Sequence, residues 1–202
     1  MKERMSTGQS NQETEIKLRL GGAAEGRRLL KRAGFRVVRR RVFEDNTLFD
    51  TEDRKLQRAG LALRVRQCGR RVLLTFKGRV QEGKHKSREE LELEISEAAT
   101  FTRILSRLGL EPGFRYQKYR TEYARRGDDG LATLDETPIG CFLELEGEPK
   151  WIDRTAAELG FGPTDYITAS YASLYWQHRE QNPQTPQDMV FSITSRTSKP
   201  RS

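Results

Sequence analysis

The stretch from Glu13 to Leu20 reads ETEIKLRL, and its charged and apolar side chains alternate. Its odd positions carry Glu13, Glu15, Lys17 and Arg19, and its even positions carry Thr14, Ile16, Leu18 and Leu20. Successive side chains of a β-strand point to opposite faces, so the stretch predicts a strand with one charged and one mostly apolar face. The fold must therefore provide surroundings for a face that is wholly charged.

Strand-like alternation recurs along the chain, at 13–20, 35–43, 46–50, 61–67, 71–77, 88–95, 115–124, 131–135 and 141–147. Apolar residues spaced three and four apart predict helices at 23–33, 101–108, 152–159 and 171–178. Gly34, Gly109 and Gly160 follow three of these helices, and a glycine there favours a left-handed cap. Many short strands with a few helices predict an α+β fold built on a barrel or a sandwich.

Charged residues share one face of most predicted strands. They are Arg64, Arg66, Lys77, Arg88, Glu90, Glu92, Glu94, Lys118, Arg120, Glu122, Glu144 and Glu146. One interpretation is a set of solvated faces on an ordinary antiparallel sheet. The other is a barrel whose apolar faces point out toward helices and whose charged faces line a wet tunnel, because about eight strands leave room for a small ligand.

Burial limits what such a tunnel could contain. An uncompensated charge removed from water costs several kcal/mol, so each must meet an opposite charge, a metal or a charged ligand. Carboxylates suit a hard divalent cation, and Arg with Lys suits phosphate oxygens. The mixed charges therefore indicate a metal-phosphate site.

The composition of the chain restricts its class. It has 202 residues and a formal net charge of +8, which favours anionic partners. No apolar run approaches the roughly 18 residues of a membrane span, and the N-terminus lacks the apolar core of a secretory signal. We expect a soluble cytoplasmic protein with a disordered tail at 1–11, a folded domain at 12–179 and a disordered tail at 180–202.

The blocks of charged residues resemble, in order, those of the CYTH proteins, the triphosphate tunnel metalloenzymes. Glu13-x-Glu15-x-Lys17 is similar to the family's ExExK motif. The further blocks are EDNTLFDT at 44–51, LALRVR at 61–66, LTFKG at 74–78, REELELE at 88–94, KYR at 118–120, LDETPIGCFLELEGE at 134–148 and SYASL at 170–174. The resemblance covers about residues 11–178 and implies an eight-stranded antiparallel β-barrel tunnel with helices packed outside.

The resemblance also implies roles for individual residues. Phosphate-binding residues would be Lys17, Arg64, Arg66, Lys77, Lys118 and Arg120. Ligands for Mg²⁺ or Mn²⁺ would be Glu13, Glu15, Glu90, Glu92, Asp135, Glu144 and Glu146, with Glu94 an alternative in the middle of the acidic wall. The catalytic residues would be Glu13, Glu15 and Lys17.

The resemblance leaves the reaction open. Hydrolysis of an inorganic or organic triphosphate is the first expectation, and a class IV adenylyl cyclase reaction that converts ATP to cyclic AMP and pyrophosphate is the alternative. A non-catalytic polyphosphate or nucleic-acid binder is a third reading, suggested by the RRRV stretch at 39–42. We expect a triphosphate-bearing small molecule as partner, no membrane and no nucleic acid, with a homodimer left open.

Two local features bear on these expectations. Many members of the family carry a lysine shortly before the final Ser-Tyr, whereas this chain has Ala169, and the loss of a cation would weaken phosphate binding. The stretch GRVQEGKH at 78–85 approaches a phosphate-binding loop, but it ends in His85 and precedes a predicted strand instead of a helix. We predict a plain hairpin loop there.

Overall fold

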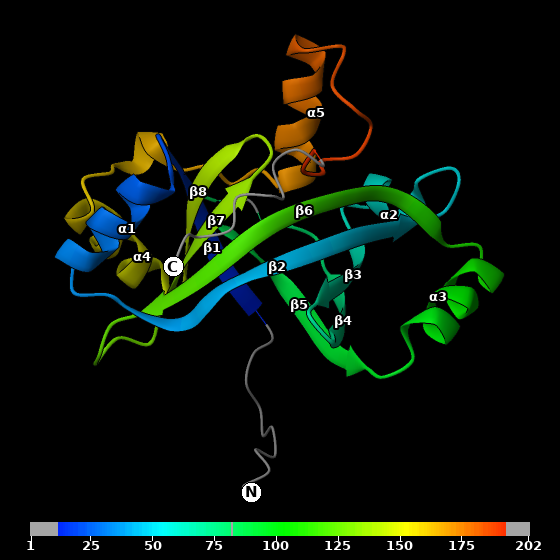
Figure 1. Cartoon of the computed structure of the whole chain (residues 1–202), viewed down its shortest axis with the longest axis horizontal. Helices are drawn as coiled ribbons and strands as arrows, with labels where there is room; N and C mark the ends of the chain where they lie inside the picture. Colours follow the sequence, from blue (N-terminus) through cyan, green and yellow to red (C-terminus); the bar gives the residue numbers. More distant parts are fainter. Residues whose placement is uncertain (1–11, 82, 193–202) are drawn as a thin grey trace, which may run out of the picture.

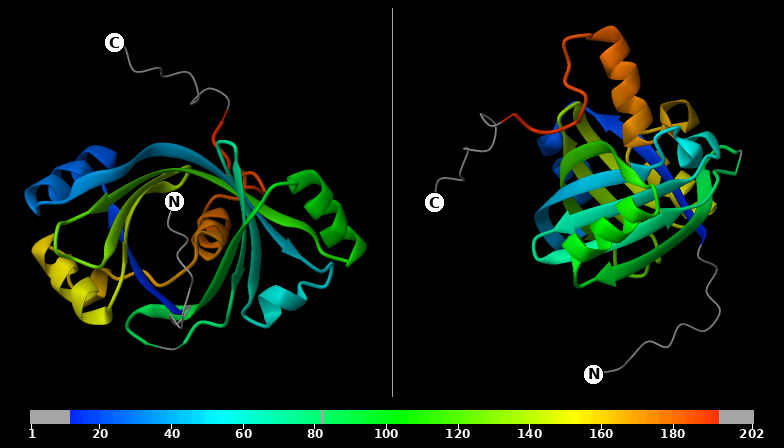
Figure 2. Two further views of the ribbon diagram at one scale, coloured as in Figure 1. Left: turned by 90° about the horizontal axis from the view of Figure 1, so that it is seen from below. Right: turned by 90° about the vertical axis from the view of Figure 1, so that its right-hand side faces the viewer.

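The chain folds into a closed antiparallel β-barrel with helices on its outside (Figure 1). The computed structural model describes residues 12–81 and 83–192, so the tail expected at 1–11 lies outside the described residues. The barrel order is β1-β5-β4-β3-β2-β6-β7-β8, and β1 pairs with β8 to close it. Seen along the barrel, the strands form a ring, with α5 at its far end (Figure 2, left).

Eight strands form the barrel in the described part of the chain. Their bounds are β1 Gln12–Leu20, β2 Arg36–Asp50, β3 Ala62–Cys68, β4 Arg71–Lys77, β5 Lys86–Ile95, β6 Glu111–Ala124, β7 Leu131–Thr137 and β8 Gly140–Glu146. The predicted eight-stranded tunnel fold is confirmed.

The two strands expected at 35–43 and 46–50 are one long strand, β2. The charged residues Glu44 and Asp45 lie at the expected gap, and both are neutralised in place. Glu44 points into the barrel, where Arg66 binds it, while Asp45 accepts a hydrogen bond from Arg115. Compensated charges let the strand continue through a polar stretch.

Five α-helices occur in the described residues: α1 Ala23–Arg32, α2 Lys55–Arg58, α3 Ala98–Arg107, α4 Pro149–Glu158 and α5 Tyr171–Gln181. A 3₁₀ turn covers Pro163–Asp165. Gly34, Gly109 and Gly160 have φ angles of 81°, 78° and 92°, as expected for left-handed helix ends. The four-residue helix α2 was not predicted, because a single turn is too short to show a helical period.

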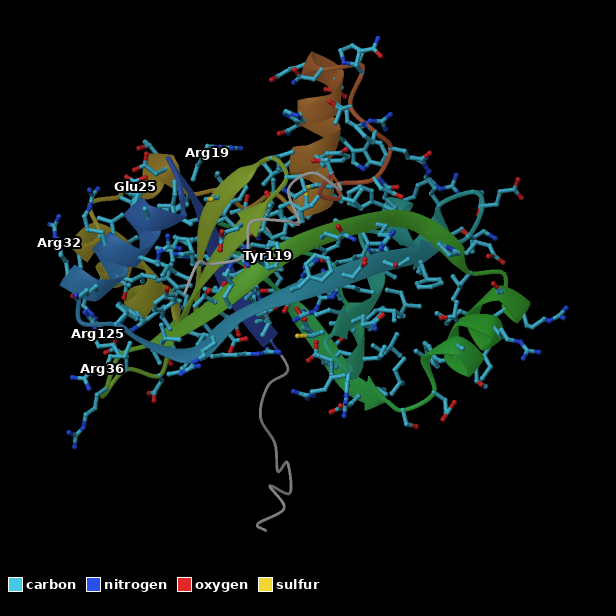
Figure 3. The ribbon with its side chains drawn as sticks, viewed as in Figure 1. Arg19, Glu25, Arg32, Arg36, Tyr119 and Arg125 are labelled. Carbon is cyan, nitrogen blue, oxygen red and sulfur yellow. The ribbon has the colours of Figure 1, made fainter. Side chains whose placement is uncertain are left out.

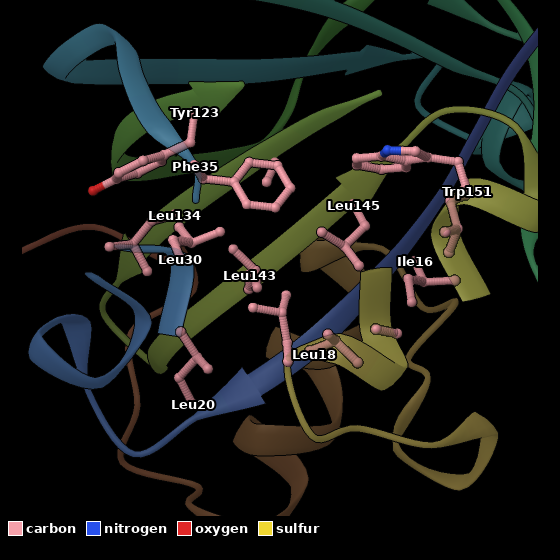
Figure 4. Packing of buried hydrophobic residues seen from close by; sticks show 14 residues of the cluster. Ile16, Leu18, Leu20, Leu30, Phe35, Tyr123, Leu134, Leu143, Leu145 and Trp151 are labelled. Atoms are coloured by element: carbon pink, nitrogen blue, oxygen red, sulfur yellow. The ribbon is translucent and has the colours of Figure 1, made fainter. Parts of the chain in front are cut away.

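The larger core lies outside the barrel, between helices α1 and α4 and strands β1, β7 and β8 (Figure 4). Ile16 and Leu18 of β1 are fully buried there and pack with Leu30 of α1 and Ile152 of α4. The apolar face of ETEIKLRL thus points outward against helices, so its charged face points into the barrel.

The outward face of β5 is less covered. Leu91 and Leu93 of β5 are 43% and 54% exposed. In the strand register they lie opposite Phe76 and Leu74 of β4. The helices therefore cover the barrel unevenly.

A second core packs α5 and the segment after it onto β6. Its buried residues are Phe114, Tyr116, Phe142, Tyr171, Leu174, Tyr175 and Met189. The segment 182–192 was expected to belong to a disordered tail, yet Met189 is fully buried and exchanges backbone hydrogen bonds with β6. Its polar composition concealed a short apolar run at 189–191, in which Phe191 also packs on Tyr119, and a strand-like pairing. Residues 193–202 lie outside the described part.

The stretch 78–85 connects β4 to the antiparallel strand β5 and leads into no helix, as predicted. Among the residues that the structure describes, no helix is long and apolar enough to cross a membrane.

Candidate functional site

A cavity of about 640 Å³ occupies the barrel. It is lined by most of the charged residues that the sequence predicted for the site: Glu13, Glu15, Lys17, Arg64, Arg66, Lys77, Glu90, Lys118, Arg120, Glu144 and Glu146. The alternation of each strand places them there, because one face of every strand packs outward. Three predicted residues, Glu92, Glu94 and Asp135, do not line the cavity.

Strand register brings the two ends of the folded chain together. β1 and β8 are antiparallel neighbours in which Glu15 lies opposite Glu146 and Lys17 lies opposite Glu144. The Lys17 Nζ atom is 3.3 Å from Glu15 Oε1 and 3.3 Å from Glu144 Oε1. These charges are buried and compensate one another.

A second ion-pair network surrounds Asp135, which is fully buried. Its carboxylate accepts hydrogen bonds from Lys118 at 2.7 Å and from Arg120 at 2.8 and 2.6 Å. Tyr171 of α5 donates a further hydrogen bond at 2.8 Å. Arg120 also donates to Glu144. The predicted metal ligand Asp135 thus lies behind two cations instead of facing the cavity.

The opposite wall holds the other cations. Arg64 Nη2 lies 3.0 Å from Thr75 Oγ1 and 3.6 Å from carboxylate oxygens of both Glu90 and Glu92. Arg66 lies 3.4 Å from Glu44. Arg64, Arg66 and Lys77 thus pair with carboxylates of β2 and β5, and all three line the cavity.

Carboxylates crowd together at the β1, β5 and β8 side. Lys77 binds Glu90 and lies 3.5 Å from Glu13. Burial and a hydrogen bond with Glu90 raise the pKa of Glu13, and burial together with the charge of Glu15 raises the pKa of Glu146. Both shifts mean that this wall has more negative charge than its own cations neutralise.

Other carboxylates stay ionised despite burial. Burial alone would raise the pKa of Glu15, but Lys17 and Lys86 outweigh it and hold this pKa well below its usual range. Burial likewise opposes ionisation of Glu144, and Arg120 with Lys17 keeps the pKa of Glu144 low. The site therefore contains permanently charged carboxylates beside others that a cation would stabilise in the charged form.

The donor set fits Mg²⁺ or Mn²⁺, because it consists of carboxylate oxygens in excess over local cations. No group of three His, Cys, Asp or Glu side chains within 12–81 and 83–192 is arranged as a ready metal site, since Lys17 and Lys77 hold several of these oxygens in ion pairs. Glu13, Glu15, Glu144 and Glu146, which all line the cavity, are the carboxylates that could hold such an ion.

The remaining predicted acids differ in position. Glu92 accepts a hydrogen bond from Thr75 at 2.9 Å and supports Arg64. Glu94 forms an exposed pair with Arg71. Of the three middle glutamates, only Glu90 lines the cavity.

The site also contains residues that the sequence reasoning did not assign to it. Lys86 and Arg88 of β5 and Tyr116 of β6 line the cavity, and Glu44 of β2 is fully buried beside it. Lys86 Nζ lies 2.7 Å from Glu15 Oε1. Lys86 shares the alternation of Arg88 and Glu90, which the sequence already placed on the charged face, so the same periodicity could have identified Lys86 as well.

Comparison with known proteins identifies relatives. A family model described as CYTH domain matches residues 11–171. A candidate adenylate cyclase from Methanocaldococcus jannaschii is 30% identical over 135 residues, which cover 66% of this chain and 75% of that protein. The match to the family model thus covers all eight strands of the barrel and most of the charged blocks.

Solved structures share the fold. A candidate adenylate cyclase from Vibrio parahaemolyticus matches with a TM-score of 0.71 and 20% identity, covering 83% of this chain and 99% of that one. A Pyrococcus horikoshii protein matches with a TM-score of 0.69 and 27% identity over 83% and 99% of the two chains. An adenylyl cyclase candidate from Hippeastrum, described as having a dominant triphosphatase activity, matches with a TM-score of 0.59 and 23% identity over 82% and 96%.

Proposed function

The chain belongs to the CYTH domain family, and from this premise we propose that it hydrolyses a triphosphate-containing substrate inside the barrel with the help of Mg²⁺ or Mn²⁺. One observation carries the proposal: buried basic and acidic side chains from both ends of the folded chain line a single cavity of about 640 Å³. An apolar interior would be less costly in free energy, because every buried charge must be compensated. The charged interior therefore supports a functional role for these residues.

Substrate binding would exchange partners within the cavity. Arg64, Arg66, Lys118 and Arg120 would bind phosphate oxygens, with Lys17 and Lys77 turning from carboxylates toward the substrate. Arg120 binds both Asp135 and Glu144, so a phosphate could replace Glu144 while Asp135 keeps the guanidinium in position. Charge-assisted hydrogen bonds of this kind are among the strongest available to a protein.

The carboxylates released by this exchange would hold the metal. Glu15 and Glu144 stay ionised, and Glu13 and Glu146 would ionise beside a cation. When bound, Mg²⁺ or Mn²⁺ supplies neutralisation of charge on the phosphate oxygens. Glu13 would orient water for in-line attack on the terminal phosphorus and accept its proton, while Arg64 and Arg66 stabilise the departing diphosphate.

Cyclisation of ATP is the alternative reaction. In that case the ribose 3′-hydroxyl would attack the α-phosphorus and pyrophosphate would leave. The Methanocaldococcus jannaschii relative is named for the cyclase reaction, whereas the Hippeastrum protein with this fold is described by its triphosphatase activity. The second description supports hydrolysis as the first choice.

A non-catalytic binder is supported less well. Some of the excess basic charge lies outside the cavity, where Arg32 and Arg36 are placed near α1 (Figure 3). In the RRRV stretch, however, Arg39 pairs with Glu122 and Arg41 pairs with Glu136. These pairs reduce the charge that a nucleic acid would meet.

A substrate panel tests the proposal. Inorganic triphosphate, thiamine triphosphate and ATP are incubated with Mg²⁺ or Mn²⁺, and phosphate and cyclic AMP are measured separately. We expect phosphate release that is abolished by EDTA and reduced at least about 100-fold in Glu15→Gln and Glu146→Gln, as loss of charge at a reacting phosphate predicts. The matched control is Glu94→Gln, which removes an exposed carboxylate outside the cavity.

Each alternative gives a different result. If cyclic AMP is the main product, the chain catalyses the cyclase reaction and the proposal of hydrolysis is wrong. Tight binding of intact substrate, with no product from any of the three, would leave only a binder.

A further inference from the structure

Exposed apolar side chains gather on one side of the barrel, at β5 and α3. The exposed large apolar residues of the described part of the chain are Val37, Val38, Val80, Leu91, Leu93, Ile104 and Leu108. The last four belong to β5, to α3 or to the residue directly after α3. Helix α3 begins three residues after the end of β5 and lies beside it (Figures 1 and 2). Their exposure is therefore concentrated in one region of the molecule.

The strand register extends this surface over two more strands. On the outward side of the sheet, Leu74 of β4 lies between Val65 of β3 and Leu93 of β5. Phe76 of β4 lies opposite Leu91 in the neighbouring row. None of these five side chains is buried, and none belongs to the two apolar cores. With two residues of the α3 region they form a surface that we call the apolar face: Val65, Leu74, Phe76, Leu91, Leu93, Ile104 and Leu108.

The apolar face is separate from the cavity. Leu91 and Leu93 alternate along β5 with Glu90, which lines the cavity on the inside of the barrel. A one-sided antiparallel sheet normally keeps its apolar side on the core and its polar side toward water. In β5 the charged side faces the cavity, so the apolar side is left without a cover. Burial of this side against another apolar surface would be favourable.

Unpaired charges of both signs accompany the apolar face. Helix α3 carries Arg103 and Arg107 and no acidic residue. Glu89 precedes Leu91 on the outward side of β5, and Glu97 lies between β5 and α3. All four side chains are exposed, and none of them forms an ion pair within the described residues. A surface with an apolar centre, a basic helix and an acidic strand is complementary to a second copy of itself, since a two-fold axis brings each helix onto the other strand.

We propose that the apolar face is the interface of a homodimer, in which α3 of each copy packs on β5 of the other. The part of the face on β3, β4 and β5 measures about 14 Å across the strands and about 20 Å along them, and α3 adds a strip of about 150 Å². This apolar centre of about 450 Å² per copy, enclosed by a polar rim, suits the roughly 800 Å² that each partner buries in a standard interface.

Sedimentation analysis of the full chain tests the apolar centre. We expect a reversible dimer, and Leu93→Asp should raise its dissociation constant at least about 30-fold, as a charge in the centre of an interface predicts. The matched control is Val38→Asp, which adds the same charge at a 60% exposed apolar residue near the start of β2. That part of β2 is next to α1, at the other end of the molecule from α3 (Figure 1). Urea denaturation of both variants verifies that they fold.

Charge reversal tests how the two copies are oriented. The basic-to-acidic variant carries Arg103→Glu and Arg107→Glu, and the acidic-to-basic variant carries Glu89→Arg and Glu97→Arg. Each variant alone should dimerise at least about 10-fold more weakly, because like charges then meet at both symmetry-related contacts. An equimolar mixture of the two should form a heterodimer about as tightly as the wild type, because opposite charges meet again at both contacts.

Three results would overturn the homodimer. A wild type that stays monomeric up to about 100 µM would leave the apolar face to a different partner or to a tail of the same chain. Equal weakening by Leu93→Asp and Val38→Asp would place the interface elsewhere. A mixture of the charge-reversal variants that associates no better than either alone would refute the contact between α3 and β5. None of these measurements depends on hydrolysis of a triphosphate.

Discussion

Lys17 Nζ and Glu144 Oε1 lie 3.3 Å apart across the seam where β1 meets β8. Both side chains are almost fully buried, and Lys17 belongs to the first strand while Glu144 belongs to the last. Closure of the barrel therefore also brings these two residues of the cavity wall together. The charges that line the cavity also hold the two ends of the folded chain together.

The Lys17–Glu144 pair should show strong coupling in stability. We expect Lys17→Met and Glu144→Gln each to lower the free energy of unfolding by about 3 kcal/mol, because each leaves a buried partner less compensated. The double variant should lose at least about 1 kcal/mol less than the sum. Urea denaturation at pH 7 measures this, and the exposed pair Arg71–Glu94 should show much weaker coupling because solvent screens it. Strict additivity at Lys17 and Glu144 would contradict a stabilising ion pair.

Asp135 should position phosphate-binding cations more than it binds metal. Its carboxylate contacts Lys118, Arg120 and Tyr171, so Asp135→Asn should raise the KM for the triphosphate about 10-fold or more. The metal concentration that gives half-maximal activity should change far less. Tyr171→Phe removes one contact of the same carboxylate and should have a smaller effect. A large rise in the metal requirement, without a change in KM, would restore the role of metal ligand.

Glu44 should make the fold sensitive to acid. Burial of its carboxyl would raise the pKa, but Lys118, Arg120 and Arg66 together lower the pKa of Glu44 from its ordinary value of 4.5 to about 2. A group with a lowered folded-state pKa stabilises the fold fully above its unfolded pKa, and that stability is lost as the pH falls from about 4.5 toward 2. The shift corresponds to at most about 3 kcal/mol.

Comparison of Glu44→Gln with the wild type isolates this contribution. Urea denaturation between about pH 5 and pH 2 should show a shallower loss of stability in the variant, because it has no proton to take up at position 44. Parallel pH profiles for the two proteins would show that Glu44 is not responsible. Glu94→Gln provides a control for a carboxylate that is half exposed.

Ala169 should be a position where phosphate affinity can be increased. It lines the cavity close to Tyr171, at the place where the CYTH resemblance leads one to expect a lysine. A lysine there would add a charge-assisted contact, so Ala169→Lys should lower the KM for inorganic triphosphate about 10-fold. The control is Ala99→Lys, which adds the same charge at an exposed position of α3 outside the cavity. Equal effects of both substitutions would indicate general electrostatic attraction instead.

Periodicity in the sequence predicted most of the secondary structure and the direction in which each strand faces. The alternation in ETEIKLRL identifies a charged and an apolar face, and Ile16 and Leu18 are indeed buried against helices while Lys17 points inward. The sequence could not show that Glu44 continues β2, because the ion pair with Arg66 comes from a neighbouring strand. Nor could it show that Met189 anchors the C-terminal segment, since the short apolar run Met189–Phe191 is too brief to reveal a period.

The amino-acid sequence by itself determined which residues are charged, their alternation and their resemblance to one family. Only the tertiary structure decided which of them meet. Glu90 lines the cavity while Glu94 pairs with Arg71 outside it, although the two have the same chemistry and parity on one strand. Asp135 lies behind Lys118 and Arg120, and Trp176 of α5 packs against Phe114 of β6. The reason is physical: parity selects a face of a strand, but barrel curvature, strand stagger and the packing of α5 determine the depth and the partners of each side chain.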